Sequence, residues 1–245
     1  TFHHFFEGKA REISMKRMLR YADAGVFHTE TICERAEGFG CKNVKCVPYP
    51  CFLDLPPMES GGHRNDPPVL LALGGTRHDK GLDILLKALK DVKAPFQLVI
   101  AGKPEDFDED YIVSHTEKYR DKVRLCLRFL SDEEVKEFLV ESDIIVLPYR
   151  REFDGASGPM CEGIYLGKTI IGPSHGSLGS QLQSSHAGYT FESENVEQLA
   201  ACIEYALTHP CVYDETAYQM QKELSPELFA ERYLRIYREV VQKKG

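Results

Sequence analysis

The sequence lacks an excess of positive charge. Its 30 lysines and arginines are outnumbered by 38 acidic residues, so the formal net charge is −8 and the pI is near 5.6. Proteins that bind nucleic acid broadly need a basic face. We therefore expect no nucleic acid among the partners of this protein.

Long hydrophobic runs are also missing. No stretch approaches the roughly 18 to 20 apolar residues that a membrane-spanning helix needs, and no basic-then-apolar signal peptide opens the chain. The chain does not begin with methionine. We therefore expect a fragment of a longer protein that resides in the cytoplasm.

Familiar cysteine patterns are absent, although the chain has eight cysteines. Cys41, Cys46 and Cys51 recur at intervals of five, which matches no usual zinc spacing. Cys126 and Cys202 lie in strand-like and helical runs, where small, buried, reduced cysteines are common. The cysteine usage therefore indicates a reducing compartment and no cysteine-bound metal.

What the sequence does have is alternation. With 245 residues, 42% of them hydrophobic, the chain can bury a full core. From residue 68 onward, amphipathic helical segments separate short apolar runs, and one such segment opens with a capping-box pattern, Ser131 to Glu134. Strands joined by helices of this length form βαβ units, so the sequence predicts an α/β fold with a doubly wound, Rossmann-like parallel sheet. The predicted strands span residues 68–74, 96–102, 123–129, 143–148, 168–172 and 187–191.

Composition divides the chain into four segments. Residues 1–55 contain too few elements to close a sheet and are expected to be the incomplete end of a second domain. Residues 56–67 are rich in proline, glycine and polar residues, as linkers are. Residues 68–225 would form the sheet domain, and residues 226–245 a C-terminal amphipathic helix. Its expected packing positions are Leu228, Tyr233, Ile236, Tyr237 and Val240.

A glycine-rich basic loop follows the first strand of the sheet domain. Gly74 and Gly75 let the backbone turn sharply and approach a ligand. Arg77 and Lys80 place two cations near the start of the next helix, whose free N–H groups attract anions. The glycine and lysine order fits neither a Walker loop nor a dinucleotide fingerprint. The loop therefore favours phosphate binding, with an exposed basic turn as the alternative.

A second polar loop follows the strand at 143–148. Asp154 lies in this loop, and Glu162 lies about one turn into a helix that Pro159 is expected to begin, with Ser157 as its N-cap. Carboxylates here can accept hydrogen bonds from sugar or ribose hydroxyls, and the backbone N–H groups around Ser157 and Gly158 can meet phosphate. The alternative is a solvated loop acid followed by a first-turn acid. Both loops should line one rim, beyond the carboxyl ends of the strands.

Weaker candidates lie on the same rim. The loop 105–111 carries alternating acids that could hold a divalent metal beside a nucleotide, but it fits an exposed acidic loop better, so we expect no metal. His175 and Ser177 follow the predicted strand at 168–172 and are further candidates for lining the rim.

Taken together, four stretches in order resemble the retaining group 1 glycosyltransferases of GT-B architecture. This resemblance implies a donor-binding domain preceded by the end of the acceptor-side domain. It also implies a UDP- or GDP-linked sugar as donor and a glycan or lipid-linked acceptor, as in cell envelope polysaccharide biosynthesis. The four stretches are residues 20–50, 71–89, 140–150 and 154–172.

The resemblance also implies roles for single residues. Arg77 and Lys80 would bind the donor diphosphate and stabilise the leaving phosphate without metal or cofactor. Glu162 would bind the ribose, and Asp154, where the family usually has glutamate, would contact the transferred sugar. Because most of the acceptor side is missing, we expect the fragment alone to be poorly active. Two alternatives stay open: a nucleotide-sugar 2-epimerase of the same architecture and a non-catalytic nucleotide-sugar-binding module.

Residues 8–22 form a basic amphipathic segment with one acid, Glu12. Ile13, Met15, Met18 and Leu19 can supply its apolar side. Helices of this kind often lie on anionic membranes, so we expect peripheral contact with the inner face of the membrane. The alternative is a packed helix whose cations are only solvated. The cations are Lys9, Arg11, Lys16, Arg17 and Arg20.

Overall fold

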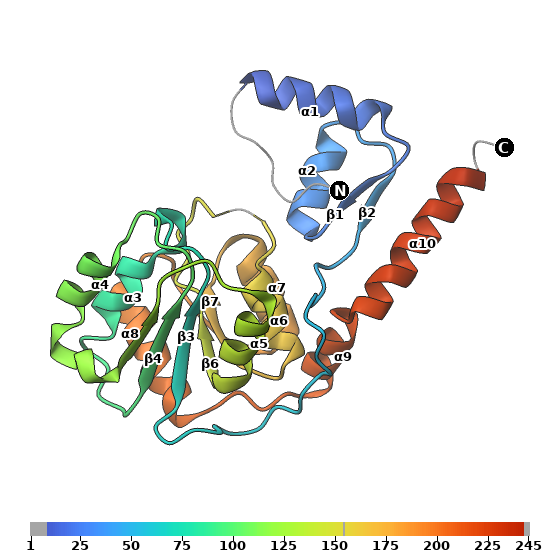
Figure 1. The fold of residues 1–245 in the computed structure, drawn as a ribbon. Helices are drawn as coiled ribbons and strands as arrows, with labels where there is room; N and C mark the ends of the chain where they lie inside the picture. Colours follow the sequence, from blue (N-terminus) through green and yellow to red (C-terminus); the bar gives the residue numbers. More distant parts are fainter. Residues whose placement is uncertain (1–8, 154, 243–245) are drawn as a thin grey trace.

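The computed structural model describes residues 9–153 and 155–242; Asp154, one of the predicted site residues, lies outside them. The main feature is a sheet of six parallel strands in the order β5-β4-β3-β6-β7-β8 (Figure 1). This order and the flanking helices confirm the predicted doubly wound α/β fold. The strands are β3 (Val69–Leu73), β4 (Gln97–Ala101), β5 (Val123–Cys126), β6 (Ile144–Val146), β7 (Thr169–Pro173) and β8 (Gly188–Phe191).

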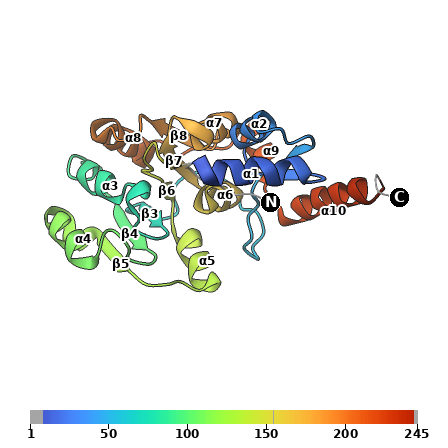
Figure 2. The ribbon, with the colours of Figure 1, turned by 90° about the horizontal axis from the view of Figure 1, so that it is seen from above.

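Helices connect the strands and cover both faces of the sheet. Figure 2 shows α3 and α8 on one side of the strands and α5 and α6 on the other. Ser131 caps α5 with the reciprocal hydrogen bonds of a capping box, as its sequence predicts. The elements are η1 (His78–Lys80), α3 (Leu82–Ala88), α4 (Glu109–His115), η2 (Glu117–Lys122), α5 (Asp132–Glu141), α6 (Gly158–Tyr165), α7 (Gly176–Ser185), α8 (Val196–Thr208) and α9 (Glu215–Glu223).

The sheet separates two hydrophobic cores because side chains alternate along each strand. In β3, Leu70 faces α3, α4 and α8, whereas Leu71 faces α5, α6, α7 and α9. Both leucines are fully buried. A strand that is buried on both faces reads as a continuous apolar run, which is why these strands could be located from the sequence.

The order in which successive strands are added to the sheet reverses between the parallel strands β3 and β6. These strands are neighbours, with Leu70 opposite Ile144, but β4 and β5 lie beyond β3, and β7 and β8 lie beyond β6. Loops at such a reversal leave in opposite directions, so a crevice opens at the carboxyl ends of the two strands. Both predicted polar loops start there.

The N-terminal part has a small sheet of its own. Strand β1 (Gly25–Phe27) pairs in parallel with β2 (Val44–Cys46), and α1 (Lys9–Tyr21) and α2 (Glu30–Gly38) pack on it. An extended segment leads from β2 to β3 (Figure 1). Helix α10 (Pro226–Gln242) returns to this part, where Ile236 packs against β1. The four-segment division of the chain stays a prediction.

The two terminal helices differ in detail from their sequence patterns. In α1, Met15 and Leu19 are buried, but Ile13 and Met18 are exposed beside the cations. In α10, Ile236 is buried as expected, but Tyr237 is 60% exposed. No helix in residues 9–153 and 155–242 has the length and apolar character needed to cross a membrane.

Candidate functional site

A cavity of about 450 Å³ opens at the crevice between β3 and β6; we call it the rim cavity. The residues that follow β3 form one side, and the start of α5 and α6 forms the other. Five predicted residues line it together, although they come from two distant loops. They are Gly74, Gly75, Arg77, Lys80 and Glu162.

Lys80 lies over the backbone of Gly74. A Cβ atom built on Gly74 would lie 2.5 Å from the Lys80 Nζ, and Gly74 has a φ of +111°, so glycine is needed here for two reasons. The ammonium also lies 5.7 Å from the centroid of the Tyr149 ring. In the described part of the chain no carboxylate pairs with Lys80, because the neighbouring Asp79 is paired with Arg77. The Lys80 charge is thus available to an anionic ligand.

Arg77 is less available than its place in the sequence indicates. Its guanidinium donates two hydrogen bonds to Asp79, Nε to Oδ1 at 2.9 Å and Nη2 to Oδ2 at 2.7 Å. This bond to Asp79 raises the pKa of Arg77 against the effect of burial. The Arg77 side chain is 49% exposed, so a bound phosphate would share it with Asp79 or displace that carboxylate.

Glu162 projects into the rim cavity from α6. Burial, with a smaller effect from the charge of Asp132, raises the pKa of Glu162 to about 7. No donor within the described residues forms a hydrogen bond with its carboxyl group that lowers this pKa. A carboxylate in this condition gains strongly from a ligand that donates hydroxyl hydrogen bonds, because these favour the ionised form.

The start of α6 is built as its sequence predicts. Ser157 is the N-cap and accepts a hydrogen bond from the Met160 N–H at 3.4 Å, and the helix begins at Gly158, one residue before Pro159. Ser157 is 2% exposed, and its Oγ lies 3.4 Å from the Tyr149 hydroxyl. Neither Ser157 nor Gly158 is among the described residues that line the rim cavity.

Sequence reasoning named the acidic part of the loop that follows β4 as a weaker candidate, but it missed the residues at the start of that loop. Gly102, Lys103 and Glu105 line the rim cavity beside Gly75. A Cβ on Gly102 would overlap the Gly74 carbonyl group, so only glycine lets the two loops approach each other. The rule that ligands bind beyond carboxyl strand ends applies to β4 as well, and it could have identified Lys103.

The acidic loop 105–111 uses two of its carboxylates in local hydrogen bonds. The Asp106 carboxylate accepts a hydrogen bond from the His78 N–H at 2.7 Å, so it holds η1 in place. The Asp108 carboxylate caps α4 through the Tyr111 N–H at 2.8 Å. These contacts explain why acids stand at both positions. Among the described residues no group of three or more His, Cys, Asp or Glu side chains could hold a metal ion.

A buried ion pair joins the two polar loops. Arg150, just after β6, forms hydrogen bonds to both carboxylate oxygens of Asp83 in α3, at 2.9 and 3.0 Å. The same guanidinium donates to the His78 carbonyl at 2.8 Å, and the Arg150 N–H donates to the Asp79 carbonyl at 2.9 Å. Arg150 therefore fixes the backbone of η1, which carries Lys80.

The rim cavity combines three kinds of surface. Lys80, Lys103 and Arg77 supply positive charge near the ends of β3 and β4, and Glu162 supplies a hydrogen-bond acceptor near α6. The Phe129 ring, which is 83% exposed, provides an apolar platform beside them. Such a set suits a ligand with an anionic group, hydroxyl groups and a flat ring.

Comparison with known proteins identifies the family of this chain. The profile of the family described as "Glycosyl transferases group 1" matches residues 58–224. An uncharacterized glycosyltransferase from Methanocaldococcus jannaschii is 30% identical over 129 residues, which make up 53% of this chain and 35% of that protein.

Two solved structures share the fold of this chain at low sequence identity. The sucrose-phosphate synthase of Thermosynechococcus elongatus superposes with a TM-score of 0.76 at 17% identity, over 96% of this chain and 62% of that one. HepE of Anabaena, solved with UDP and glucose, gives 0.72 at 12% identity, over 94% and 67%. This chain thus spans about a third of its curated relative and less than two thirds of the synthase. Because the family profile covers most of its length, the chain belongs to the group 1 glycosyltransferases.

Proposed function

We propose that this chain carries the donor half-site of a retaining glycosyltransferase that uses a UDP- or GDP-linked sugar. The diphosphate would lie against Lys80, Lys103 and the backbone of Gly74 and Gly75, and the ribose would bond to Glu162. The Phe129 ring offers a stacking surface for the base. The observation that carries this proposal is the Lys80 ammonium, which no carboxylate among the described residues pairs with, in a cavity shared with Glu162.

The chemistry follows from where charge develops during transfer. As the glycosidic bond breaks, negative charge grows on the leaving diphosphate, and fixed cations stabilise it without reorganisation. We propose that Lys80 supplies this charge together with Lys103, which lies 4.0 Å from Glu105, and that neither metal nor cofactor is needed. Asp154, which the sequence assigns to the transferred sugar, stays a prediction because it lies outside the described residues. We propose a glycan or lipid-linked acceptor and a cytoplasmic location.

Calorimetry of the chain with UDP, GDP and their glucose or mannose conjugates tests this function. We expect one nucleoside diphosphate to bind in the presence of EDTA with an affinity that added magnesium leaves unchanged. Strict dependence on magnesium would contradict the metal-free proposal. Incubation with a nucleotide sugar alone is the second arm, because an inverted configuration at C2 of the sugar would support the 2-epimerase instead.

Binding of a nucleotide sugar should increase with pH through Glu162. Its pKa is raised to about 7, and ribose hydroxyls donate preferentially to the ionised carboxylate. If only that form binds, the affinity should rise roughly tenfold between pH 6 and 8, as the ionised fraction grows from about 9% to about 91%. A nucleotide sugar, unlike a free diphosphate, has no group of its own that titrates there.

Glu162→Gln provides the control for this pH dependence. The amide has a similar shape and no charge to titrate, so its affinity should be weaker and flat across the same range. A wild-type affinity that is flat, or that falls as pH rises, would remove Glu162 from the ribose site.

We also propose that α1 contacts an anionic membrane surface. Its exposed face combines Ile13, Met18 and Tyr21, which are 66%, 53% and 78% exposed, with the exposed cations Arg17 and Arg20. Each cation near such a surface contributes about 1 kcal/mol. Replacing both by glutamate should lower binding to phosphatidylserine vesicles at least roughly 30-fold in co-sedimentation. Arg235→Glu with Arg238→Glu on α10 is the matched control, and equal losses would contradict the proposal.

A further inference from the structure

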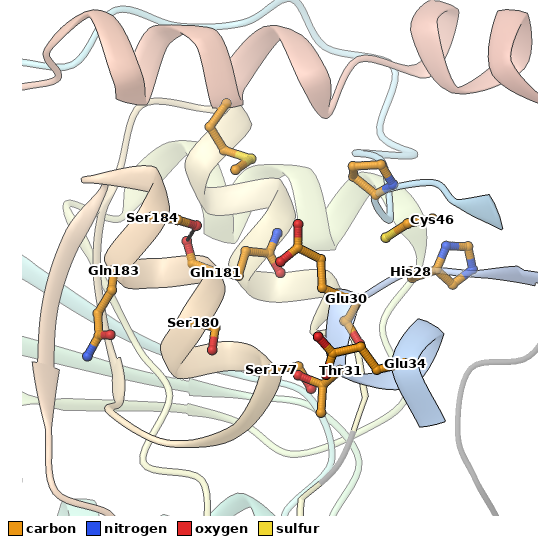
Figure 3. A pocket seen from close by; sticks show the side chains of 13 residues that line it. His28, Glu30, Thr31, Glu34, Cys46, Ser177, Ser180, Gln181, Gln183 and Ser184 are labelled. Atoms are coloured by element: carbon orange, nitrogen blue, oxygen red, sulfur yellow. Dashed lines mark hydrogen bonds between the residues drawn. The ribbon is translucent and has the colours of Figure 1, made fainter. Parts of the chain in front are cut away.

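A second and larger cavity, of about 760 Å³, lies between α2 and α7; we call it the α2–α7 cavity. Figure 3 shows Ser177, Ser180, Gln181 and Ser184 along one edge of α7, with Glu30 and Thr31 opposite them on α2. The N-terminal part of the chain and the sheet domain thus both contribute to it. Its volume is in the range of cavities that bind small ligands.

The lining of this cavity is polar without being cationic. Helix α7 contributes hydroxyl and amide groups, and α2 contributes the carboxylates of Glu30 and Glu34. Among the described residues that line the cavity none is lysine or arginine. A phosphate or carboxylate group here would face two acids with no lysine or arginine in the described lining, whereas hydroxyl groups and amines would find acceptors. The cavity is therefore opposite in charge character to the rim cavity, where Lys80 and Lys103 lie.

One buried group in the α2–α7 cavity lacks a partner. Ser177, in the first turn of α7, is 6% exposed, and no hydrogen bond to its Oγ is formed by any of the described residues. His175, the N-cap of α7, makes no side-chain bond to the first turn. A buried hydroxyl left unsatisfied costs about 1 to 3 kcal/mol, so both the Ser177 hydroxyl and the start of α7 would gain from a ligand that bonds to them.

Helix α6 lies close to both cavities. Gln181, which lines the α2–α7 cavity, lies with its amide 3.7 Å from the Sγ of Cys161, the residue before Glu162. Tyr49 follows Pro48 of the cavity lining, and its ring lies 3.9 Å from the position of a Cβ on Gly158. A ligand in the α2–α7 cavity would therefore lie near the start of α6, which lines the rim cavity through Pro159 and Glu162.

We propose that the α2–α7 cavity binds an uncharged or amine-bearing sugar ring and selects against phosphorylated or carboxylated sugars. Ser177 and Gln181 would bond to ring hydroxyls, and Glu30 and Glu34 would accept from hydroxyls or an amine. The assignment of this ring to the acceptor of transfer rests on the proposed function. The binding preference itself rests on the residues of this cavity alone.

Saturation-transfer NMR of the chain tests the binding preference. The probes are methyl α-glucopyranoside, glucosamine and glucose 6-phosphate, each at millimolar concentration. We expect signals from the glucoside and stronger signals from glucosamine, but none from the phosphate. Equal or stronger binding of glucose 6-phosphate, or no signal from any probe, would overturn the proposal.

Two variants locate the binding. Ser180 is exposed on the cavity face of α7, so Ser180→Trp should fill the cavity and abolish the sugar signals. Ser114→Trp adds the same bulk at an exposed position of α4 and should leave the signals unchanged. Glu34→Gln should weaken the preference for glucosamine over the glucoside while both still bind, because Glu30 stays in place. Loss of signal in both tryptophan variants, or in neither, would place the binding elsewhere.

UDP and GDP titrations of the same samples separate this proposal from the proposed function. If the sugars bind but neither nucleotide does, the donor site is wrong and the sugar cavity stands without its role as acceptor site. If a nucleotide binds equally to wild type and Ser180→Trp while no sugar binds to either, the donor site stands and the sugar cavity is wrong. Sugar signals that disappear on addition of the nucleotide would also overturn the proposal, because they would place the sugar in the rim cavity.

Discussion

Lys80→Ala should weaken the binding of the preferred nucleoside diphosphate by about 1.5 to 3 kcal/mol, which corresponds to roughly 10- to 150-fold in Kd. A charge-assisted hydrogen bond to phosphate is worth about this amount. The Lys80 ammonium lines the rim cavity and has no competing ion pair within the described residues, so its loss removes a contact to ligand and, within the protein, only its contact with the Tyr149 ring. Calorimetry with UDP and GDP measures the effect.

Lys90→Ala is the control for this measurement. Lys90 follows α3 at its far end and is exposed, so its removal changes the net charge of the chain by the same amount without touching the rim cavity. We expect its affinity to match that of the wild type. A Lys80→Ala variant that binds as tightly as wild type would remove the lysine from the diphosphate site.

Arg77→Ala should weaken the binding of the nucleoside diphosphate less than Lys80→Ala does. The sequence alone does not predict this difference. The two residues look equivalent in the sequence, three positions apart in one basic loop. In the structure Asp79 already takes two hydrogen bonds from Arg77, so a ligand must compete for the guanidinium. A pairing between residues two apart is not specified by residue types alone, because it depends on the backbone of η1.

The central strands of the sheet were predictable because they are largely buried on both faces. The apolar runs around Leu70, Ile100 and Ile171 match β3, β4 and β7 to within one or two residues. Ligands of parallel α/β sheets bind beyond the carboxyl ends of the strands. This rule predicted that the loops carrying Lys80 and Glu162 lie on one rim. These inferences needed only local patterns and the geometry of parallel sheets.

The remaining parts of the site depend on contacts between distant segments. The burial that raises the pKa of Glu162, the approach of Gly102 to Gly74 and the bonds from Arg150 to α3 all join loops that are far apart in the chain. The α2–α7 cavity was not predictable either, because it lies between two parts that the sequence separates by a linker. Ser177 could be placed on the rim, but its buried and unpartnered hydroxyl could not be predicted.

Arg150→Ala should have the largest effect on stability, a loss of about 3 kcal/mol in the free energy of unfolding. Removing one partner of a buried ion pair costs about 3 to 5 kcal/mol, and the side chains of Arg150 and Asp83 are only 13% and 9% exposed. We expect the lower end because Lys87 still pairs with Asp83, at 3.0 Å. Urea denaturation followed by circular dichroism measures the loss.

The pH dependence of stability gives a second measurement of the same pair. Burial alone would raise the pKa of Asp83, but the hydrogen bonds from Arg150 and Lys87 outweigh it and lower the pKa below the ordinary value of 3.8. The folded state therefore gains from the ionised carboxylate at neutral pH, and this gain is lost as the pH falls through that lowered pKa. In Arg150→Ala the gain should be smaller, so the variant should lose less stability than wild type on acidification.

Arg151→Ala is the matched control. Arg151 has the same side chain as Arg150 but is much more exposed. Its side chain is 63% exposed and pairs at 3.3 Å with Glu192, which is 54% exposed. Exposed pairs of this kind contribute about 0 to 1 kcal/mol. If both variants lose the same stability, burial does not decide the strength of the Arg150–Asp83 pair. If only Arg150→Ala is unstable, nucleotide titration at a temperature where the variant stays folded should also show weaker binding. The variant lacks the guanidinium that donates to the His78 carbonyl, and its backbone N–H, which donates to the Asp79 carbonyl, is no longer held by the ion pair with Asp83.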